Sequence, residues 1–343
     1  MHQINKQFFS KKNAVFFIAE IGGNHEGDFD QAKRLTKLAL ESGADAIKFQ
    51  FYTGDSLVCK QESPDRNAHF KKFELSDEEN LFLIKMVKKG GAIPMASVWN
   101  LEMLKWANPY LPYHKVGSGD LTYYPMLAAL VETKKPIILS TGLSSLTEVA
   151  SAIEYIKKCD SSYISDKKLA LLQCTSSYPT PDEDVNLAAM QTLKNEFGLP
   201  VGYSDHTIGS HAIEAAVAMG AEIIEKHFTD TREGKTFRDH MIALTSEEVK
   251  KSLSTMSRIA LFTGSNEKKL SKSERKAKHH ISFRRGIYLS RDMKEGEKIC
   301  AQDLKYLRPM HGICASKYKD VIGKIIKRDI SAGQPIADKD IGN

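Results

Sequence analysis

The chain has 343 residues, a hydrophobic content of 41%, a charged content of 27% and a formal net charge of +6. These values are typical of a globular protein with one large domain or with a large and a small one, and the net charge is too small to indicate nucleic-acid binding. No apolar stretch is long enough to span a bilayer, and the N-terminus lacks a signal core, so no membrane association is expected. The five cysteines form no C-x-x-C pair, which predicts reduced thiols and a cytoplasmic protein.

Strand-like and helix-like segments alternate along the first 260 residues. Most of the strand-like segments are continuous apolar runs, as expected of strands that are covered on both faces. Helical spacing of apolar residues fills 28–43, and Ser76 and Thr245, each followed by acidic residues, are expected to cap helices. The strand-like segments span residues 14–22, 46–52, 92–99, 113–120, 136–143, 168–176, 199–205 and 221–229. Eight strand–helix units predict an α/β protein with a (β/α)8 TIM barrel, and an open doubly wound sheet is the alternative.

A basic stretch follows the predicted barrel. Eight Lys or Arg residues and a single acid, Glu274, lie between Lys268 and Arg285, which predicts a solvated linker. Phe283 is the only Phe, Tyr or Trp in residues 264–285, so no stacking platform for nucleic acid is expected there.

The last part of the chain has a different pattern, in which strand-like segments (286–290 and 321–327) precede turn-like segments (292–296 and 329–334). This pattern predicts a small β-rich module that needs a partner surface for stability. The predicted domains are a barrel at 1–263, a basic linker at 264–281 and the β-rich module at 282–343.

His206 and His227 each end a strand-like run, and a helix-sized segment, 210–220, separates the two runs. If the runs are parallel neighbours in one sheet, both imidazoles lie at the same carboxyl edge, where they can bind a divalent metal. Each could instead be an ordinary hydrogen-bonded histidine.

Other predicted strand ends carry groups that suit a phosphorylated, carboxylated ligand. Lys48 and Lys115 end two different strands, and Ser118, Ser140 and Ser204 offer hydroxyl donors near glycines. In TIM barrels the chemistry lies at this carboxyl end. The five residues together predict an anion site there.

Glu20 ends the first strand-like run. A carboxylate buried there without a partner would be costly, so Glu20 meets a cation, has a shifted pKa or faces the cleft. In the cleft it could act as an acid or base. The structural alternative is a salt bridge to Lys48 across the barrel.

Several ordered segments of the chain resemble the sialic acid synthase family, which includes N-acetylneuraminate, legionaminate and pseudaminate synthases. The tail resembles the C-terminal antifreeze-like (SAF) domain of that family. The segments that carry the resemblance are 17–27, 43–50, 114–119, 138–142, 174–181, 202–207 and 224–229, with 292–296, 308–309 and 323–333 in the tail.

The resemblance implies a reaction and a set of site residues. Phosphoenolpyruvate would be joined to an N-acylated hexose, either N-acetylmannosamine or a diacetamido-dideoxy hexose, to give a nine-carbon 2-keto sugar acid and phosphate. The cofactor would be Mn²⁺ or Mg²⁺. By resemblance, the metal ligands are His206 and His227. Phosphoenolpyruvate would be held by Lys48, Lys115, Ser118, Ser140 and Ser204. The resemblance places Gln50, Tyr178 and Asp239 near the sugar or the metal, and it implies Glu20 and Asp239 as the catalytic residues.

The resemblance also implies a homodimer. Arg308 matches an arginine that reaches from the SAF domain into the barrel mouth of a second subunit, so a domain-swapped dimer is expected.

The chain departs from the family pattern near the expected sugar end. Asp120 stands where Glu is frequent, Ser176 replaces an Asn of the neuraminate type, and residues 96–99 and 237–239 also differ. These changes predict an altered sugar acceptor with phosphoenolpyruvate retained. The alternatives are an octulosonate-like condensing enzyme for a different sugar and an inactive sugar-binding homologue.

Overall fold

A computed structural model describes residues 15–343, and Ala14, the first residue of the first predicted strand, lies outside this range. The chain divides into two compact units between Gly264 and Ser265. The division falls at the start of the predicted basic linker.

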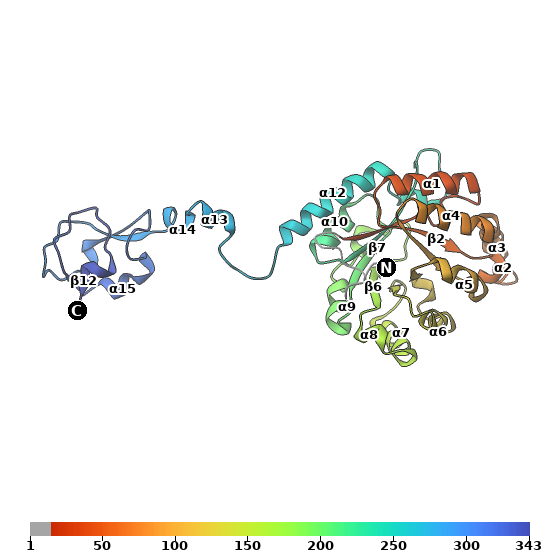
Figure 1. The fold of residues 1–343 in the computed structure, drawn as a ribbon, viewed down its shortest axis with the longest axis horizontal. Helices are drawn as coiled ribbons and strands as arrows, with labels where there is room; N and C mark the ends of the chain where they lie inside the picture. Colours follow the sequence, from red (N-terminus) through yellow and green to blue (C-terminus); the bar gives the residue numbers. More distant parts are fainter. Residues whose placement is uncertain (1–14) are drawn as a thin grey trace. The chain divides into compact units, whose positions relative to one another are not determined.

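Eight parallel strands of the first unit close into a barrel, in which each strand pairs with the next and β8 pairs with β1 (Figure 1). Each strand lies inside one of the predicted runs, and the closed order confirms the TIM barrel over the open sheet. The strands are β1 (Phe16–Glu20), β2 (Ala46–Phe51), β3 (Ile93–Val98), β4 (Tyr113–Val116), β5 (Ile137–Ser140), β6 (Leu169–Cys174), β7 (Val201–Asp205) and β8 (Ile223–His227).

Helices cover the outside of the barrel (Figure 1). The predicted caps are present: the side chain of Ser76 accepts from the backbone N–H of Glu79, and Thr245 forms a capping box with Glu248. The helices are α1 (Phe29–Glu41), α2 (Gly54–Leu57), α3 (Pro64–Phe73), α4 (Asp77–Lys89), α5 (Leu101–Ala107), α6 (Tyr124–Glu132), α7 (Leu146–Cys159), α8 (Ser162–Ser165), α9 (Ala189–Phe197), α10 (His211–Ala218), α11 (Arg238–Met241) and α12 (Ser246–Thr263), with short 3-10 turns at Asn108–Tyr110, Ser118–Asp120 and Asp182–Asp184.

The interior of the barrel changes from apolar to polar along the strands. Because side chains alternate along a strand, Ile223, Glu225 and His227 of β8 lie on one face and Ile224 and Lys226 on the other. The buried apolar side chains that fill the inner layer are Phe16, Ile18, Ala46, Met95, Ile138, Ala170, Leu172 and Ile223. They close the lower part of the barrel, so a ligand enters only from the carboxyl end.

The second unit is small and has its own apolar core, formed by residues such as Ile287, Leu289 and Ile336. The predicted strand at 321–327 is wrong in extent: Val321 ends a helix, Gly323 adopts a positive φ of 87°, and only two residues after it pair as a strand. The elements are α13 (Lys272–Lys276), α14 (His279–Ser282), β9 (Gly286–Leu289), β10 (Leu304–Leu307), α15 (Tyr318–Val321), β11 (Ile325–Ile326) and β12 (Ile341–Gly342), with 3-10 turns at Ala301–Asp303, Ala315–Lys317 and Asp338–Asp340.

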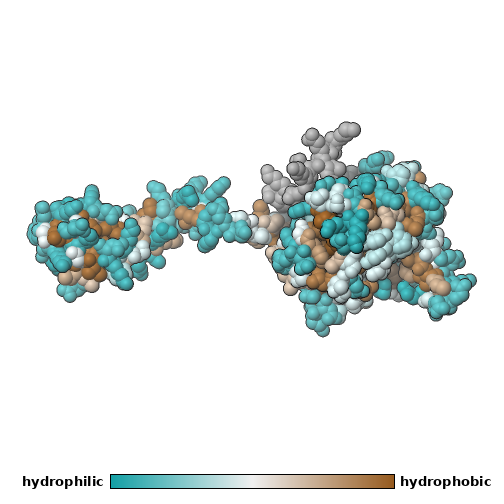
Figure 2. Space-filling model, turned by 90° about the horizontal axis from the view of Figure 1, so that it is seen from below, coloured by the Kyte–Doolittle hydropathy of each residue, from teal (hydrophilic) through white to brown (hydrophobic). Residues whose placement is uncertain are grey.

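The visible surface of the second unit is mostly hydrophilic, with hydrophobic residues between the polar ones (Figure 2). Phe283, Leu307 and Tyr318 are its largest exposed apolar side chains.

No helix of residues 15–343 combines the length and apolar character that crossing a bilayer requires.

Candidate active site

A cavity of about 1370 Å³ opens at the carboxyl ends of the barrel strands. The predicted site residues of the barrel that line it are Glu20, Lys48, Gln50, Lys115, Ser118, Asp120, Ser140, Ser176, Tyr178, Ser204, His206, His227 and Asp239. Arg308 is exposed and belongs to the second unit. The structure therefore brings together every predicted barrel residue, while the role of Arg308 stays a prediction.

Two buried lysines and one buried glutamate form the floor of the cavity. The Nζ atom of Lys115 lies 3.6 Å from Oε1 of Glu225, and that of Lys48 lies 3.8 Å from Oε2 of the same residue. The Ser204 hydroxyl donates to Oε1 of Glu225 at 3.0 Å. Burial raises the pKa of Glu225, but the two lysines outweigh burial and leave it below its ordinary value. Glu225 is therefore an anion that holds two cations at the floor.

Glu20 forms the salt bridge to Lys48 that was the structural alternative, although between neighbouring strands and not across the barrel, and its pKa is also shifted. Oε2 of Glu20 lies 2.8 Å from Nζ of Lys48, and Oε1 accepts from Nε2 of Gln50 at 2.9 Å. Burial raises the pKa of Glu20 to about 7, although the charge of Lys48 acts in the opposite direction. A carboxyl group with this pKa exchanges a proton readily near neutral pH.

Burial acts differently on the two lysines. It lowers the pKa of Lys115, which is buried close to Lys48. Burial also lowers the pKa of Lys48, but the carboxylates of Glu20 and Glu225 outweigh it and leave this pKa above the ordinary value. Lys48 is thus the more firmly charged of the two.

Four hydroxyl groups on or just after β4 to β7 line the cavity, those of Ser118, Ser140, Ser176 and Ser204. Lys115 donates to the Ser140 hydroxyl at 2.7 Å, and the Ser118 hydroxyl accepts from the backbone N–H of Gly142 at 3.1 Å. Added to Gly142, a Cβ atom would lie 2.7 Å from Oγ of Ser176 and 2.8 Å from Oγ of Ser118. The absence of a side chain at Gly142 therefore lets both hydroxyls lie close to its backbone.

His206 and His227 converge, with 5.5 Å between their ring centroids. Nδ1 of His206 donates to the carbonyl oxygen of Thr175 at 2.8 Å, which leaves Nε2 as the free ring nitrogen. Nδ1 of His227 is buried and, within residues 15–343, has no hydrogen-bond partner. The pairing of β8 with β1 places His227 beside Glu20.

The pKa values of the two imidazoles differ. Burial, with the nearby charges of His206 and Lys48, holds the pKa of His227 well below its ordinary value, so this ring is neutral. Burial also lowers the pKa of His206, but contacts with Cys174 and the carbonyl of Thr175 outweigh burial and leave it raised. A proton and a cation would therefore compete for His206.

These residues fit a divalent metal ion. The free nitrogens of the two rings are suitable ligands, and Oδ2 of Asp239 lies 3.8 Å from Nδ1 of His227. In the described part of the chain, no three His, Cys, Asp or Glu side chains are grouped closely enough to hold an ion by themselves. The protein would therefore supply two nitrogen ligands and leave other positions to substrate or water.

Tyr178 lies against both the histidines and the loop after β8. Its ring centroid is 4.1 Å from that of His206, and the guanidinium of Arg238 lies 4.5 Å from its face. The adjacent Asp239 is buried, and burial raises its pKa. Burial likewise raises the pKa of Asp120, to about 6.

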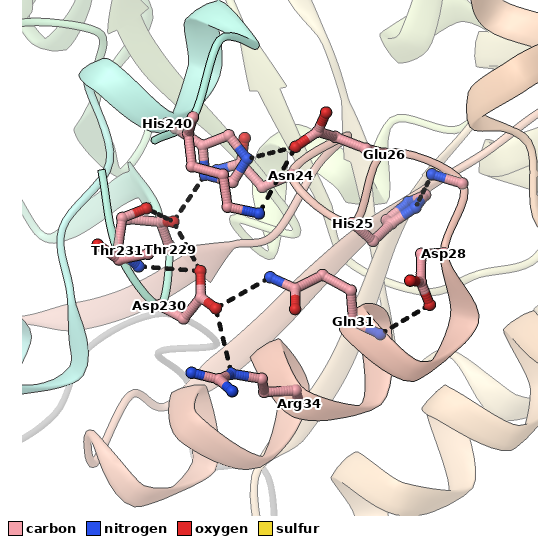
Figure 3. A network of polar contacts seen from close by, with 12 residues as sticks. Asn24, His25, Glu26, Asp28, Gln31, Arg34, Thr229, Asp230, Thr231 and His240 are labelled. Atoms are coloured by element: carbon pink, nitrogen blue, oxygen red, sulfur yellow. Dashed lines mark hydrogen bonds and ion pairs between the residues drawn. The ribbon is translucent and has the colours of Figure 1, made fainter. Parts of the chain in front are cut away.

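The loop after β8, which carries Asp239, is anchored to the loop after β1 (Figure 3). Oε1 of Glu26 lies 3.3 Å from Nε2 of His240, and Nδ1 of His240 lies 2.7 Å from the Thr229 hydroxyl. Asp230 accepts from Gln31 of α1 at 3.0 Å. The contacts of its neighbours His240 and Asp230 therefore help to position Asp239.

Glu225 was not predicted as a site residue. It is the middle residue of the five-residue strand β8, two positions before His227. Strand alternation was the available signal, because residues 225 and 227 face the same side. Lys226, the residue before His227, faces outward and pairs with Asp205 at 2.6 Å.

The sequence matches two family profiles: the NeuB family at residues 35–268 and the SAF domain at residues 284–342. The N,N'-diacetyllegionaminic acid synthase of Legionella pneumophila is 38% identical over 331 residues, 93% of this chain and 92% of that protein. The pseudaminic acid synthase of Campylobacter jejuni is 30% identical over 348 residues, 97% of this chain and 98% of that protein. The crystal structure of an N-acetylneuraminic acid synthetase from Leptospira borgpetersenii has a TM-score of 0.73 and 33% identity, covering 79% of this chain and 93% of that one.

Proposed function

The chain belongs to the NeuB family, and we propose that this enzyme joins phosphoenolpyruvate to an N-acylated hexose, giving a nine-carbon 2-keto sugar acid and phosphate. The observation that carries the proposal is the buried floor of Lys48 and Lys115 beside two converging imidazoles. A buried pair of lysines suits a small ligand with both phosphate and carboxylate groups. The imidazoles suit the metal that such an aldehyde acceptor needs.

Phosphoenolpyruvate binds at the lysine side in this proposal. Lys115 and the Ser118, Ser140 and Ser204 hydroxyls hold its anionic groups, and Lys48 orients it above Glu225. Holding the ligand in this way places its C3 atom against the aldehyde carbon, so that a bimolecular step becomes a step within one complex.

Glu20 is the proton-transfer residue in this proposal. One of its oxygens accepts a hydrogen bond from Gln50, and the other forms the salt bridge to Lys48. In this proposal Glu20 is therefore a carboxylate when the reaction begins. It takes a proton from the water that adds at C2 of the condensed intermediate, after which the C2–O bond to phosphate breaks. A pKa of about 7 allows Glu20 to accept and release this proton in one cycle.

Mn²⁺ or Mg²⁺, held by His206 and His227, would supply Lewis-acid polarisation of the acceptor aldehyde. Asp239, Gln50 and Tyr178 orient the sugar around it. Asp120 and Ser176 lie at the same mouth and contact the acceptor or its solvent shell. Arg308 of a second copy completes the mouth in a homodimer exchanged through the SAF domain.

The acceptor is a diacetamido-dideoxy hexose rather than N-acetylmannosamine. The chain is 38% identical to a diacetyllegionaminic acid synthase and 33% identical to the N-acetylneuraminic acid synthetase, which supports this choice. The departures at Asp120 and Ser176 support it as well. A panel of both sugars, incubated with phosphoenolpyruvate and Mn²⁺ and analysed by mass spectrometry, tests it. Faster turnover of N-acetylmannosamine than of any diamino-dideoxy hexose would show that the acceptor is wrong.

Replacing Gly142 by alanine is expected to weaken the binding of phosphoenolpyruvate. The new Cβ would push apart the Ser118 and Ser176 hydroxyls, and overpacking of this kind costs about 1–3 kcal/mol. We expect the KM for phosphoenolpyruvate to rise roughly ten-fold, as steady-state kinetics would measure. Gly119→Ala is the matched control, because a Cβ at that position meets nothing within 4 Å. A wild-type KM in the Gly142 variant would contradict this role.

Replacing His240 by alanine is expected to loosen the loop that carries Asp239. The change removes contacts to Glu26 and Thr229, and each lost hydrogen bond costs about 1 kcal/mol. We expect a KM for the sugar raised about ten-fold, with the KM for phosphoenolpyruvate little changed. His211→Ala, at an exposed histidine, should behave as wild type. Equal changes in the two KM values would argue against a link to Asp239.

A further inference from the structure

Aromatic side chains form a continuous arc along one side of the cavity. The ring of Tyr52 stacks on Trp99 at 5.2 Å and meets the edge of Phe70 at 5.3 Å. His69 and Phe73, with ring centroids 4.4 Å apart, continue the arc. It ends at Phe237 in the loop after β8, 4.9 Å from Phe73. All of these residues line the cavity.

Much of the arc belongs to a hydrogen-bonded insertion between β2 and α4. The insertion contains α2 and α3, and its buried Asn67 donates to the carbonyl oxygens of Gly54 and Val58 at 3.1 and 2.9 Å. Glu74 accepts from the backbone N–H of Gly54 at 2.6 Å. Tyr52 follows β2 directly, and Trp99 follows β3 directly. The rings are therefore positioned by strand ends and by a hydrogen-bonded loop, as a preformed surface requires.

The arc lies across the barrel mouth from the Ser140 and Ser204 hydroxyls, and it borders the turn that carries Ser118, because a Cβ atom on Gly117 would lie 3.9 Å from Nε1 of Trp99. Trp99 and Tyr52 follow β3 and β2, whereas Ser140 and Ser204 belong to β5 and β7, and the strands are arranged in chain order around the closed barrel. The β5–β7 side of the cavity thus carries hydroxyls, and the β2–β3 side combines Lys48 and the Ser97 hydroxyl with the aromatic rings. The methyl of an N-acyl group gains from contact with such an aromatic surface, whereas a hydroxyl in its place would lose solvation there.

We propose that Trp99, with Tyr52 and Phe70, binds an apolar N-acyl substituent of the sugar acceptor and thereby determines which hexose the enzyme uses. The proposal rests on the proposed function and deepens it. The methyl group of a second N-acetyl substituent is the apolar group that distinguishes a diacetamido hexose from N-acetylmannosamine. Trp99 is partly exposed and lines the cavity, so a ligand there can contact it.

Fluorescence can report directly on Trp99. The chain has two tryptophans, and the other, Trp106, stacks on Phe51 with 5.6 Å between ring centroids. The Nε1 atom of Trp106 is buried and has no hydrogen-bond partner in residues 15–343, so Trp106→Phe removes no bond. In this variant Trp99 is the only tryptophan. A 2,4-diacetamido hexose should change its emission at lower concentration than N-acetylmannosamine does.

Kinetics with both sugars provide the second test. We expect Trp99→Leu to lower the preference in kcat/KM for the diacetamido hexose over N-acetylmannosamine by about ten-fold or more, as the loss of an apolar contact does. Trp99→Phe, which keeps a ring, should retain most of the preference, and Trp106→Phe all of it. The KM for phosphoenolpyruvate should stay unchanged in the three variants.

The outcomes separate this proposal from the proposed function. If Trp99→Leu lowers kcat/KM equally for both sugars, or if neither sugar alters Trp99 emission while the wild type turns one over, the specificity role is wrong and the condensation stands. If the wild type turns over neither sugar with phosphoenolpyruvate, the proposed function is wrong.

Discussion

Replacing His227 by alanine is expected to abolish metal-dependent turnover, lowering kcat/KM by about 10³-fold, which corresponds to several kcal/mol of transition-state stabilisation. The reason is that His227 is one of the two converging imidazoles that would hold the ion in the proposed site. Isothermal titration with Mn²⁺ should show one bound ion for each wild-type chain and none for the variant. The titration gives a readout that does not depend on turnover.

His114→Leu is the matched control for His227. His114 is also buried, and burial lowers its pKa to about 3, but neither of its ring nitrogens has a hydrogen-bond partner in residues 15–343. It neighbours Lys115 on β4, and alternation directs it away from the barrel interior. We expect this variant to bind Mn²⁺ as the wild type does. If His227→Ala still bound the ion with wild-type affinity, the metal site would lie elsewhere.

Replacing Asp205 by asparagine is expected to destabilise the barrel by about 3–5 kcal/mol, because it leaves a buried charge without its partner. Asp205 and Lys226 are paired at 2.6 Å and their side chains are fully buried. Asp205 also accepts from the Tyr203 hydroxyl and from the backbone N–H of Thr207. Chemical denaturation followed by tryptophan fluorescence measures the barrel alone, since Trp99 and Trp106 both belong to it.

The double variant Asp205→Asn/Lys226→Met should recover much of the lost free energy of unfolding. It removes the unpaired charge and replaces it with an apolar side chain of similar length, a change that is close to neutral at many buried ion pairs. A single variant within about 1 kcal/mol of wild type would contradict the importance of the pair, because a loss that small is typical of exposed ion pairs.

The strands could be predicted because both faces of each one are buried. Parallel strands under helices read as continuous apolar runs, and all eight runs contain a strand. Most of the predicted runs extend past the carboxyl ends of the observed strands. Rim residues such as Ser118 and Thr141 follow the apolar residues directly, and the sequence does not mark where the strand ends. This extension of the runs helps to locate the site, because it groups the rim residues at the carboxyl ends of the predicted strands.

The prediction was weaker where short range patterns do not determine structure. The strand expected at 321–327 is interrupted by Gly323, whose positive φ favours a turn over strand pairing. Glu225 was missed because a single acid within an apolar run carries no motif, and only the closed barrel brings it between Lys48 and Lys115. The aromatic arc depends on the packing of an insertion against two strand ends, which no local spacing reveals.

The choice between a salt bridge and a cleft-facing acid at Glu20 could not be made from the residues alone. The structure shows that the two are compatible: Glu20 pairs with Lys48 and still lines the cavity. Its raised pKa follows from burial, which sequence patterns do not quantify.

The most direct test of the condensation is to measure phosphate and product together. Wild-type enzyme with phosphoenolpyruvate, a diacetamido-dideoxy hexose and Mn²⁺ should release phosphate and form the nine-carbon keto acid in equal amounts. Omitting the sugar or the metal should stop both. Phosphate release that continues without the sugar, or pyruvate in place of the nine-carbon acid, would contradict the account.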